Sequence, residues 1–317
     1  MQFRTWRHHY PIIGILAFAA FLPAAALAGC GSAFCSLHTQ WDVQGTWTEP
    51  GTRVDLRFEY IDQDQLRHNK DEISASEIPH QHHNEVRTIN RNSLLTVQHA
   101  FDTAWGLAVT LPLVDRHHLH IHDHHGELLQ ERWNYSHPGD LKLLGSYRPD
   151  GSSVGLLFGA ELPTGKTNIL NEAGVPAERS LQPGSGTADI LLGGFYQYRT
   201  PAIAWFGQLL WQRAVAEQDA FKPGQQTSVD AGLRYEGNSR LGWMLQLNLL
   251  DKSSDDGLEA ESASSGGRFI HLSPGLSIDI NDSLQMYGFV QQAVYQEVRG
   301  VQLTAERSFV VGLSSRF

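Results

Sequence analysis

The sequence has little that would form a helical membrane protein or a nucleic-acid-binding protein. Its one long apolar run is at residues 11–25, and its mean hydropathy is -0.30. A formal net charge of -10 leaves no basic surface of the kind that nucleic acid requires, so no nucleic-acid partner is expected. A membrane protein that touches lipid through strands remains possible, because only alternate residues of each strand then need to be apolar.

Catalytic signatures are scarce too. The motifs H-E-x-x-H and C-x-x-C, which hold catalytic or structural zinc, do not occur. No convincing serine–histidine or acidic set suggests a hydrolase built into a barrel wall. We therefore predict that the protein is not an enzyme and requires no cofactor.

The amino-terminus is typical of an export signal. Arg4 and Arg7 precede the apolar run, and Ala26-Leu27-Ala28 is an A-x-A cleavage site. We predict a signal peptide at residues 1–28, a plug or periplasmic segment at 29–50 and a barrel at 51–317.

Only two cysteines are present, Cys30 and Cys35. Exported proteins meet an oxidising compartment, and a turn could bring two residues five apart within disulfide distance. Leu27-Ala28-Gly29-Cys30 also resembles a lipobox, in which Cys30 would be lipidated. Both a disulfide and lipidation stay open, and neither suggests catalysis.

The last seventeen residues, Val301–Phe317, alternate between a mainly apolar and a mainly polar face. The stretch exceeds the about 9–11 residues with which a tilted strand crosses a bilayer. With its final Phe317, it resembles the closing strand of bacterial outer-membrane barrels, in which the terminal aromatic residue is part of the signal read by the barrel assembly machinery. We expect this strand to pair with the first strand.

From residue 51 onward the chain alternates between strand-like segments and connections. Long connections fall near 62–85, 115–136, 163–186, 217–227 and 251–267, and short turns separate them. Short periplasmic turns and long external loops are the plan of outer-membrane barrels. We predict an all-β fold: a transmembrane antiparallel up-and-down β-barrel of about 12 strands, in the lipid of the bacterial outer membrane.

Charged residues occupy the face of the strands that would point into the barrel. Both signs are present, so the lumen is either hydrated or braced by ion pairs. The predicted lumen-facing residues are Arg53, Asp55, Arg57, Glu59, Arg234 and Glu236.

Histidines gather in two predicted external loops. Alternation in the third strand, if it continues past the membrane, places His118, His120 and His122 on the inner face of a long hairpin at the pore mouth. Side chains two apart on a strand can share one Zn²⁺ or Cu²⁺ ion. Histidine also titrates near pH 6.5, so a pH-sensitive lid and a loop without a specific role stay open. The predicted metal ligands are His80, His82, His83, His117, His118, His120, His122, His124, His125, Asp123 and Glu127.

Three short motifs carry a family resemblance: Gly139-Asp140-Leu141, Phe158 to Lys166 (FGAELPTGK) and Gly184 to Asp189 (GSGTAD). Over about residues 50–317 the chain resembles the transporter-like outer-membrane family associated with the meta-pathway of phenol degradation. The resemblance implies a barrel that passes or binds small, often hydrophobic, compounds. The histidine hairpin is not part of that family's pattern.

We expect a passive channel for a small solute, whose external hairpin binds a transition metal. The alternative is a barrel with a closed lumen that captures metal at the surface and transports nothing.

Titration of the purified protein with Zn²⁺ and with Cu²⁺ above pH 7, where imidazole is neutral, tests the metal site. We expect saturable binding by calorimetry. A titration without saturation would contradict the prediction for both metals.

Overall fold

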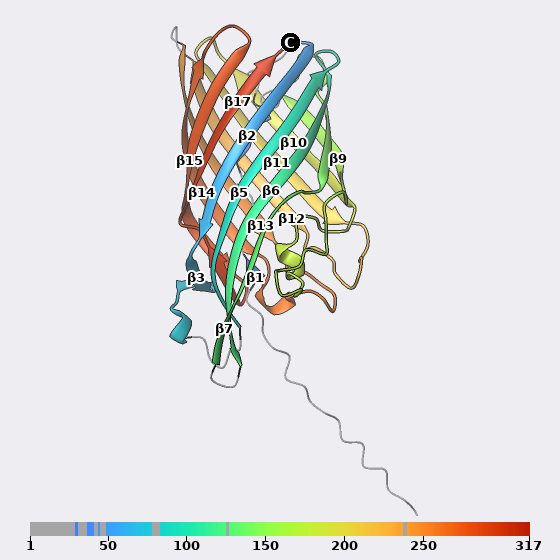
Figure 1. The fold of residues 1–317 in the computed structure, drawn as a ribbon. Coiled ribbons are helices and arrows are strands. Elements are labelled where there is room, and N and C mark those ends of the chain that lie inside the picture. Colours follow the sequence, from blue (N-terminus) through green and yellow to red (C-terminus); the bar gives the residue numbers. More distant parts are fainter. Residues whose placement is uncertain are drawn as a thin grey trace, which may run out of the picture.

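The computed structural model describes residues 29–30, 37–40, 44, 49–77, 83–124, 127–236 and 240–317. For residues 29–30, 83–84, 122–124, 127–128 and 236 it describes the backbone alone. Most of the described chain is β-strand (Figure 1). No helix in the described part is long and apolar enough to cross a membrane.

The wall of the molecule is a closed antiparallel barrel of 12 strands. Sequence neighbours pair around it, and β7 and β8 both pair with β6, so these two form one position in the wall. The wall strands are β2 (Gly51–Gln63), β5 (His83–Ala100), β6 (Trp105–His124), β7 (Glu127–Pro138), β8 (Leu141–Tyr147), β9 (Val154–Leu162), β10 (Asp189–Arg199), β11 (Ile203–Ala214), β12 (Gln226–Glu236), β13 (Leu241–Lys252), β14 (Gly267–Asp279), β15 (Leu284–Val298) and β17 (Arg307–Arg316).

The last strand closes the barrel on the first. β17 runs antiparallel to β2 with Phe309 opposite Tyr60 and Leu313 opposite Leu56. Thr52 and Phe317 extend the ladder, because the Phe317 N–H donates to the Thr52 carbonyl at 2.8 Å and the Thr52 N–H donates back at 3.3 Å. The predicted fold and strand number are confirmed, and both ends of the wall lie at the end of the barrel with short turns.

The outer face carries the apolar set of each strand. On β17, Phe309, Val311 and Leu313 alternate with the buried Ser308, Val310 and Ser314. Outward leucines, valines and aromatic residues continue over the whole wall, as a surface in contact with lipid requires. At the short-turn end, Trp105 packs on Tyr147 with ring centroids 4.5 Å apart, which is typical of the aromatic girdle at a membrane interface.

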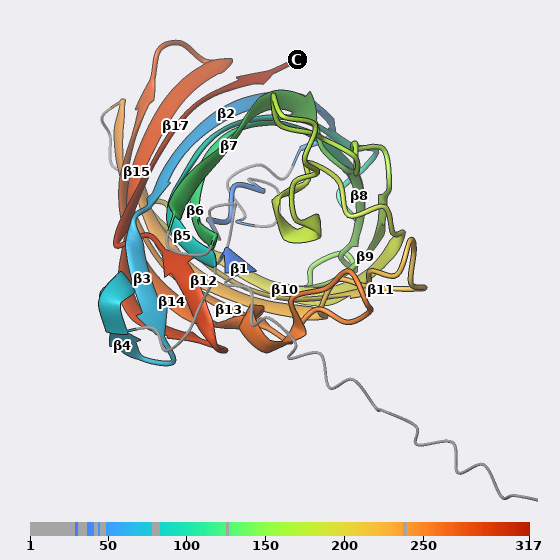
Figure 2. The same cartoon turned by 60° about the horizontal axis from the view of Figure 1, so that its bottom comes forward.

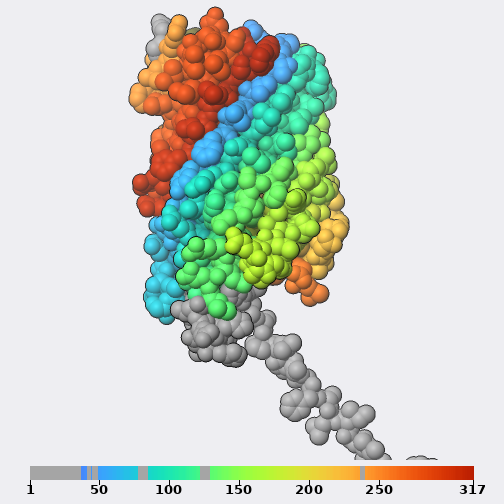
Figure 3. All heavy atoms as spheres, viewed as in Figure 1, coloured from blue at the N-terminus to red at the C-terminus, as the bar shows by residue number. Residues whose placement is uncertain are grey.

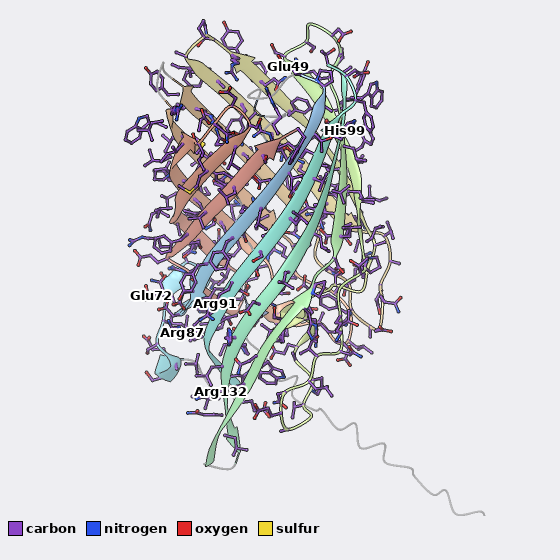
Figure 4. All side chains as sticks on the ribbon, turned by 45° about the horizontal axis from the view of Figure 1, so that its top comes forward. Glu49, Glu72, Arg87, Arg91, His99 and Arg132 are labelled. Atoms are coloured by element: carbon purple, nitrogen blue, oxygen red, sulfur yellow. The ribbon has the colours of Figure 1, made fainter. Side chains whose placement is uncertain are left out.

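Charged residues mark where the apolar belt ends toward the long loops. On the outer face, Arg87 forms an ion pair with Asp62, and Arg268 forms one with Asp251 at 2.8 Å. Figure 4 shows Arg87, Arg91 and Arg132 in the half of the molecule that bears Glu72, whereas Glu49 and His99 lie at the opposite end. By the rule that periplasmic turns are short, the end with the long loops is the external end.

The predicted closing strand 301–317 is wrong at its beginning. Residues 301–304 form a separate strand, β16 (Val301–Thr304), which pairs with β3 (Gln65–His68) and with β1 (Gly29–Cys30) in a small external sheet. β4 (Asp71–Glu72) completes that sheet. All four residues of β16 are buried, so its alternation does not separate a lipid face from a lumen face.

Two irregularities interrupt the regular wall. The register between β14 and β15 shifts between Ile270 and His271. The chain opposite β6 is divided into β7 and β8 at Gly139-Asp140. Beyond this break, β6 and β7 extend as a hairpin past the end of β8 (Figure 1).

The break at Gly139-Asp140 is the place where the three family-like motifs meet. The carboxylate of Asp140 accepts from the Gly165 N–H at 2.9 Å, the Ser185 N–H at 2.7 Å and the Ser185 hydroxyl at 2.8 Å. Thr164 donates its hydroxyl to the Gly139 carbonyl at 3.0 Å. The backbones cross so closely that a Cβ on Gly165 would lie 2.6 Å from the Gly184 Cα, so this junction needs glycine. The motifs therefore hold the base of the 163–188 loop.

Replacement of Asp140 by alanine should destabilise this junction. Asp140 is buried, and its loss leaves two backbone N–H groups without an acceptor, which costs about 2–3 kcal/mol. We expect that decrease in the free energy of unfolding, measured with urea in lipid vesicles. The control is Asp150→Ala, which removes one exposed hydrogen bond to Thr103 and should change stability little. Equal stability of the two variants would contradict this role of Asp140.

Candidate functional site

The lumen wall is polar and its charges are paired. Arg57 lies 2.9 Å from Glu59, and Asp55 accepts from the Tyr287 hydroxyl at 2.8 Å. Arg53 donates to the Ser314 hydroxyl at 3.1 Å, and Arg234 donates to the Ser277 hydroxyl at 3.3 Å. These five predicted lumen residues thus point inward into hydrogen-bonded networks, whereas the Glu236 side chain lies outside the described residues.

Neutral amides continue the polar lining around the barrel. Asn248 donates to Asp230 at 2.7 Å and accepts from the Ser273 hydroxyl at 2.8 Å. On the next wall sector, Gln212 donates to Asp189 at 2.7 Å. The groups of this lining form hydrogen bonds, and water or a polar solute can form the same bonds with them. Such a lining therefore suits an interior that water or a polar solute can enter.

A short stretch of the amino-terminal region lies inside this lumen. We call Leu37–Gln40 the lumen segment. Its first side chain, Leu37, packs in an apolar cluster with Ile61, Met244, Tyr287, Phe289 and Val310. Arg57 of β2 donates to the Leu37 carbonyl at 3.2 Å and to the Thr39 hydroxyl at 2.9 Å. These contacts attach the segment to the wall at β2, β13, β15 and β17.

The same segment is bound to the other side of the lumen through His38. The His38 N–H donates to the side-chain oxygen of Gln246 at 3.2 Å, and the Gln246 amide donates to the His38 carbonyl at 3.0 Å. The imidazole Nε2 lies 2.6 Å from the Gln208 oxygen, and the ring stacks on Phe206 at 5.3 Å between centroids. Gln44, also buried, donates to the His38 carbonyl at 2.9 Å.

The two attachment sites face each other across the barrel. In the strand order, five strands separate β2 from β11 in either direction around the wall, so Arg57 and Gln208 lie on opposite sides. Leu37–Thr39 therefore bridge the lumen near the middle of both strands. Figure 2 shows the described parts of residues 29–50 inside the ring of strands.

The described ends of this region lie at different ends of the barrel. The backbone of Gly29–Cys30 pairs with β16 at the external end. Glu49 lies 3.8 Å from Arg316, near the short turns. Cys35 lies outside the described residues, so the disulfide and lipidation both stay predictions.

A long loop also folds inward at the external mouth. We call residues 163–188 the inward loop; it carries η2 (Arg179–Leu181), which Figure 2 shows inside the ring. The buried Arg116 donates to the Leu181 carbonyl at 2.6 Å, and Tyr135 donates its hydroxyl to the same oxygen. Trp133 packs on Ala177 and Leu181 and donates to the Val175 carbonyl at 3.1 Å. In the space-filling view the yellow-green atoms of this loop lie together near the external end of the barrel (Figure 3).

The inward loop changes the environment of the histidine hairpin. His118 and His120 face the interior, as alternation predicted, but their exposed fractions are only 1% and 2%. His118 bonds to the Thr88 hydroxyl at 2.8 Å, and both rings pack against Trp133. The expectation that these two rings are presented at an open pore mouth is therefore wrong. The reason is long-range packing: the inward loop covers the face that the hairpin alone would expose.

The remaining proposed metal ligands do not complete a site in the described chain. His117 points outward and lies 3.2 Å from Asp115. For His83, His122, Asp123, His124 and Glu127 only the backbone is described, and His80, His82 and His125 lie outside the described residues. Among the side chains that the structure describes, no three His, Cys, Asp or Glu groups are placed to hold a metal. Binding of Zn²⁺ or Cu²⁺ stays a prediction.

One serine motif, Gly151-Ser152-Ser153-Val154-Gly155, has the form G-x-S-x-G. That form marks a hydrolase nucleophile only where a strand turns into a helix. Here it occupies the short turn between β8 and β9, so the required context is missing. That the protein is not an enzyme stays a prediction.

Sequence reasoning missed two carboxyl groups that join the inward loop to the loop before β14. Glu178 and Glu261 lie close enough for each carboxyl to influence the pKa of the other. Burial raises the pKa of Glu178; burial and the charge of Glu178 raise the pKa of Glu261 well above its usual range. Glu85 of β5 and Asp255 add negative charge, and Lys252 lies 2.9 Å from Asp255.

Comparisons with known proteins support the fold. No family model matches the sequence, and no curated protein matches it. Among solved structures, the chain is similar to the COG4313 outer membrane channel from Pseudomonas putida F1, with a TM-score of 0.62, 12% identity and coverage of 86% of this chain and 97% of that one.

Two further barrels are more distant. The CymD monoaromatic hydrocarbon channel gives a TM-score of 0.44 at 7% identity, with 93% of this chain and 98% of that one covered. The NanC porin gives 0.45 at 11% identity, with 83% and 100% covered. The P. putida comparison confirms the barrel fold implied by the family resemblance, while the association with phenol degradation stays a prediction.

The contact between Glu178 and Glu261 should weaken as pH rises. Both pKa values are raised in the folded protein, chiefly by burial, so the stabilisation is complete below the ordinary glutamate value of about 4.3 and is lost as pH rises through the raised values. Amide hydrogen exchange at residues 178–182, corrected for intrinsic pH dependence, should therefore accelerate as pH rises above about 4.3.

Glu178→Gln should reduce this pH dependence, because it removes one titrating carboxyl and its charge beside Glu261. Glu172→Gln, in an exposed part of the same loop, is the matched control and should preserve it. A corrected exchange rate that does not change with pH in the unaltered protein would contradict the raised pKa values.

Proposed function

We propose that the protein is an outer-membrane channel for a small solute, held closed at mid-depth by the lumen segment. The observation that carries the proposal is the bridge of Leu37–Thr39 between opposite walls, from Arg57 on β2 to Gln208 on β11. A channel needs a polar lumen, and a closed channel needs an obstruction; the described lumen is polar and contains the lumen segment. The barrel fold shared with the P. putida channel supports this proposal.

The segment is held weakly enough to be displaced. Five hydrogen bonds join Leu37–Thr39 to the wall, and each contributes about 0.5–1.5 kcal/mol. Burial of Leu37 adds about 1.5–3 kcal/mol. Ordering the four residues opposes this by about 1–2 kcal/mol each. The favourable and opposing terms nearly cancel, so the net stabilisation is at most about a few kcal/mol, small beside the ladder that holds the wall.

The closed barrel that captures metal is the competing function from the sequence. It requires the histidine hairpin to present its rings to solvent, and the burial of His118 and His120 does not favour it. The channel is therefore the function that the geometry supports best.

The double variant Leu37→Ser/His38→Ser should open the channel. It removes the apolar anchor and the imidazole contacts, together about 2–3 kcal/mol, while leaving every wall residue unchanged. We expect the open probability in a planar bilayer to rise about 10–100-fold, since each 1.4 kcal/mol is tenfold in an equilibrium.

The matched control replaces the same residue types where they are exposed near the external end, as Leu170→Ser/His68→Ser. Its conductance should equal that of the unaltered protein. If the lumen variant is folded and never conducts, the channel proposal fails and a closed-lumen function takes its place.

A further inference from the structure

The wall groups that hold the lumen segment contact its backbone as well as its side chains. Gln246 uses its oxygen and its nitrogen to bind the N–H and the carbonyl of one residue, His38, at 3.2 and 3.0 Å. This is the pairing that a neighbouring β-strand would offer to a peptide. A side chain that binds both groups is selective for a residue with a free backbone N–H and therefore excludes proline at this position.

The positions on either side of that amide are specified as well. The residue at position 37 enters an apolar cluster of five wall side chains. The residue at position 38 places a ring on Phe206 and directs Nε2 at the oxygen of Gln208, 2.6 Å away. Because that oxygen accepts, and Gln44 donates to Nδ1 at 3.3 Å, the imidazole is the tautomer with its proton on Nε2.

Arg57 completes the set on the opposite wall. Its Nη1 donates to the carbonyl of position 37 and to the hydroxyl of position 39. Glu59, 2.9 Å from Nη2, holds the guanidinium in this orientation. The wall therefore reads an apolar residue, a ring with a hydrogen-bond donor and a polar residue, in that order along an extended chain.

We propose that this mid-lumen site binds short peptides as solutes, and that the lumen segment occupies it as an internal competitor. As a solute site it rests on the proposed channel function. A free peptide with the same pattern would take the same wall groups and keep the segment displaced. Peptide binding and opening would then be a single event.

The internal competitor sets the concentration that a free peptide must reach. A tethered segment acts at an effective concentration on the order of 1 mM for a short flexible linker. Peptide should therefore bind the unaltered chain much more weakly than a chain whose segment has been loosened. This difference separates competition at the wall from binding elsewhere.

Calorimetry with acetyl-Leu-His-Thr-amide tests the site on the full-length chain carrying Leu37→Ser/His38→Ser. We expect saturable binding at least tenfold tighter than to the unaltered chain. Adding Gln246→Leu should weaken it at least tenfold. Gln98→Leu is the matched control, an equally buried lumen glutamine on β5 toward the short-turn end, and should have no effect. Acetyl-Ser-Ser-Thr-amide, which lacks the apolar residue and the ring, should not bind.

Absence of saturable heat, or equal binding with and without Gln246→Leu, would overturn the peptide site. If the variants with Leu37→Ser/His38→Ser do not fold, the unaltered chain is used to test the proposal. Excess peptide should then accelerate amide hydrogen exchange at residues 37–40. Unchanged exchange overturns the proposal. Conductance tests the channel function separately. If a variant conducts but does not bind peptide, only the peptide site is contradicted. If a variant binds peptide but does not conduct, only the channel function is contradicted.

Discussion

The pairing of β17 with β2 is the constraint on which the rest of the structure depends. In lipid every backbone N–H and carbonyl needs a partner within the protein, and only a closed sheet provides one for each strand. Closure with 12 strands fixes the width of the barrel. Barrels of 8 strands are filled by their own side chains, whereas barrels of 16 or more leave a water channel. A wall of 12 strands lies between these cases. In this protein two other parts of the chain, the lumen segment and the inward loop, occupy the interior.

The polar lining determines how that additional chain is held. Arg57 illustrates this, because one guanidinium pairs with the buried Glu59 and also donates to the lumen segment. Burying an ion pair gains little stability over apolar packing, so its presence in the middle of the lumen is not explained by stability alone. A wetted lumen explains it, since arginine, glutamate and glutamine can exchange the segment for water at little change in free energy.

The wall and its lumen-facing charges could be predicted from the sequence, whereas the contacts of the chain inside the lumen could not. Apolar residues such as Phe309, Val311 and Leu313 alternate with mainly polar ones, and short connections alternate with long ones. Both patterns are local in sequence, and a closed barrel is the fold that strands with this pattern form in lipid. The lumen segment has no such period, and His38 reaches partners 170 and 208 residues away. Strand alternation placed His118 and His120 on the correct face. Their burial could not be predicted in the same way, because it depends on a contact between Arg116 and Leu181, which are 65 residues apart. Residues 301–304 alternate like a wall strand and still leave the barrel, because Val301 and Leu303 pack on Leu66.

The contrast in stability between wall and segment gives the molecule a way to change state without unfolding. Each wall strand is held on both edges by a continuous ladder, so its opening approaches the free energy of global unfolding. Leu37–Thr39 are held by five side-chain hydrogen bonds and one apolar side chain, so they can leave in a local event. The chain that follows them enters β2 at Gly51, so a released segment stays tethered near its site and returns in a unimolecular step. Under the proposed gating, closing is a unimolecular step, whereas opening by a competing solute depends on the solute concentration.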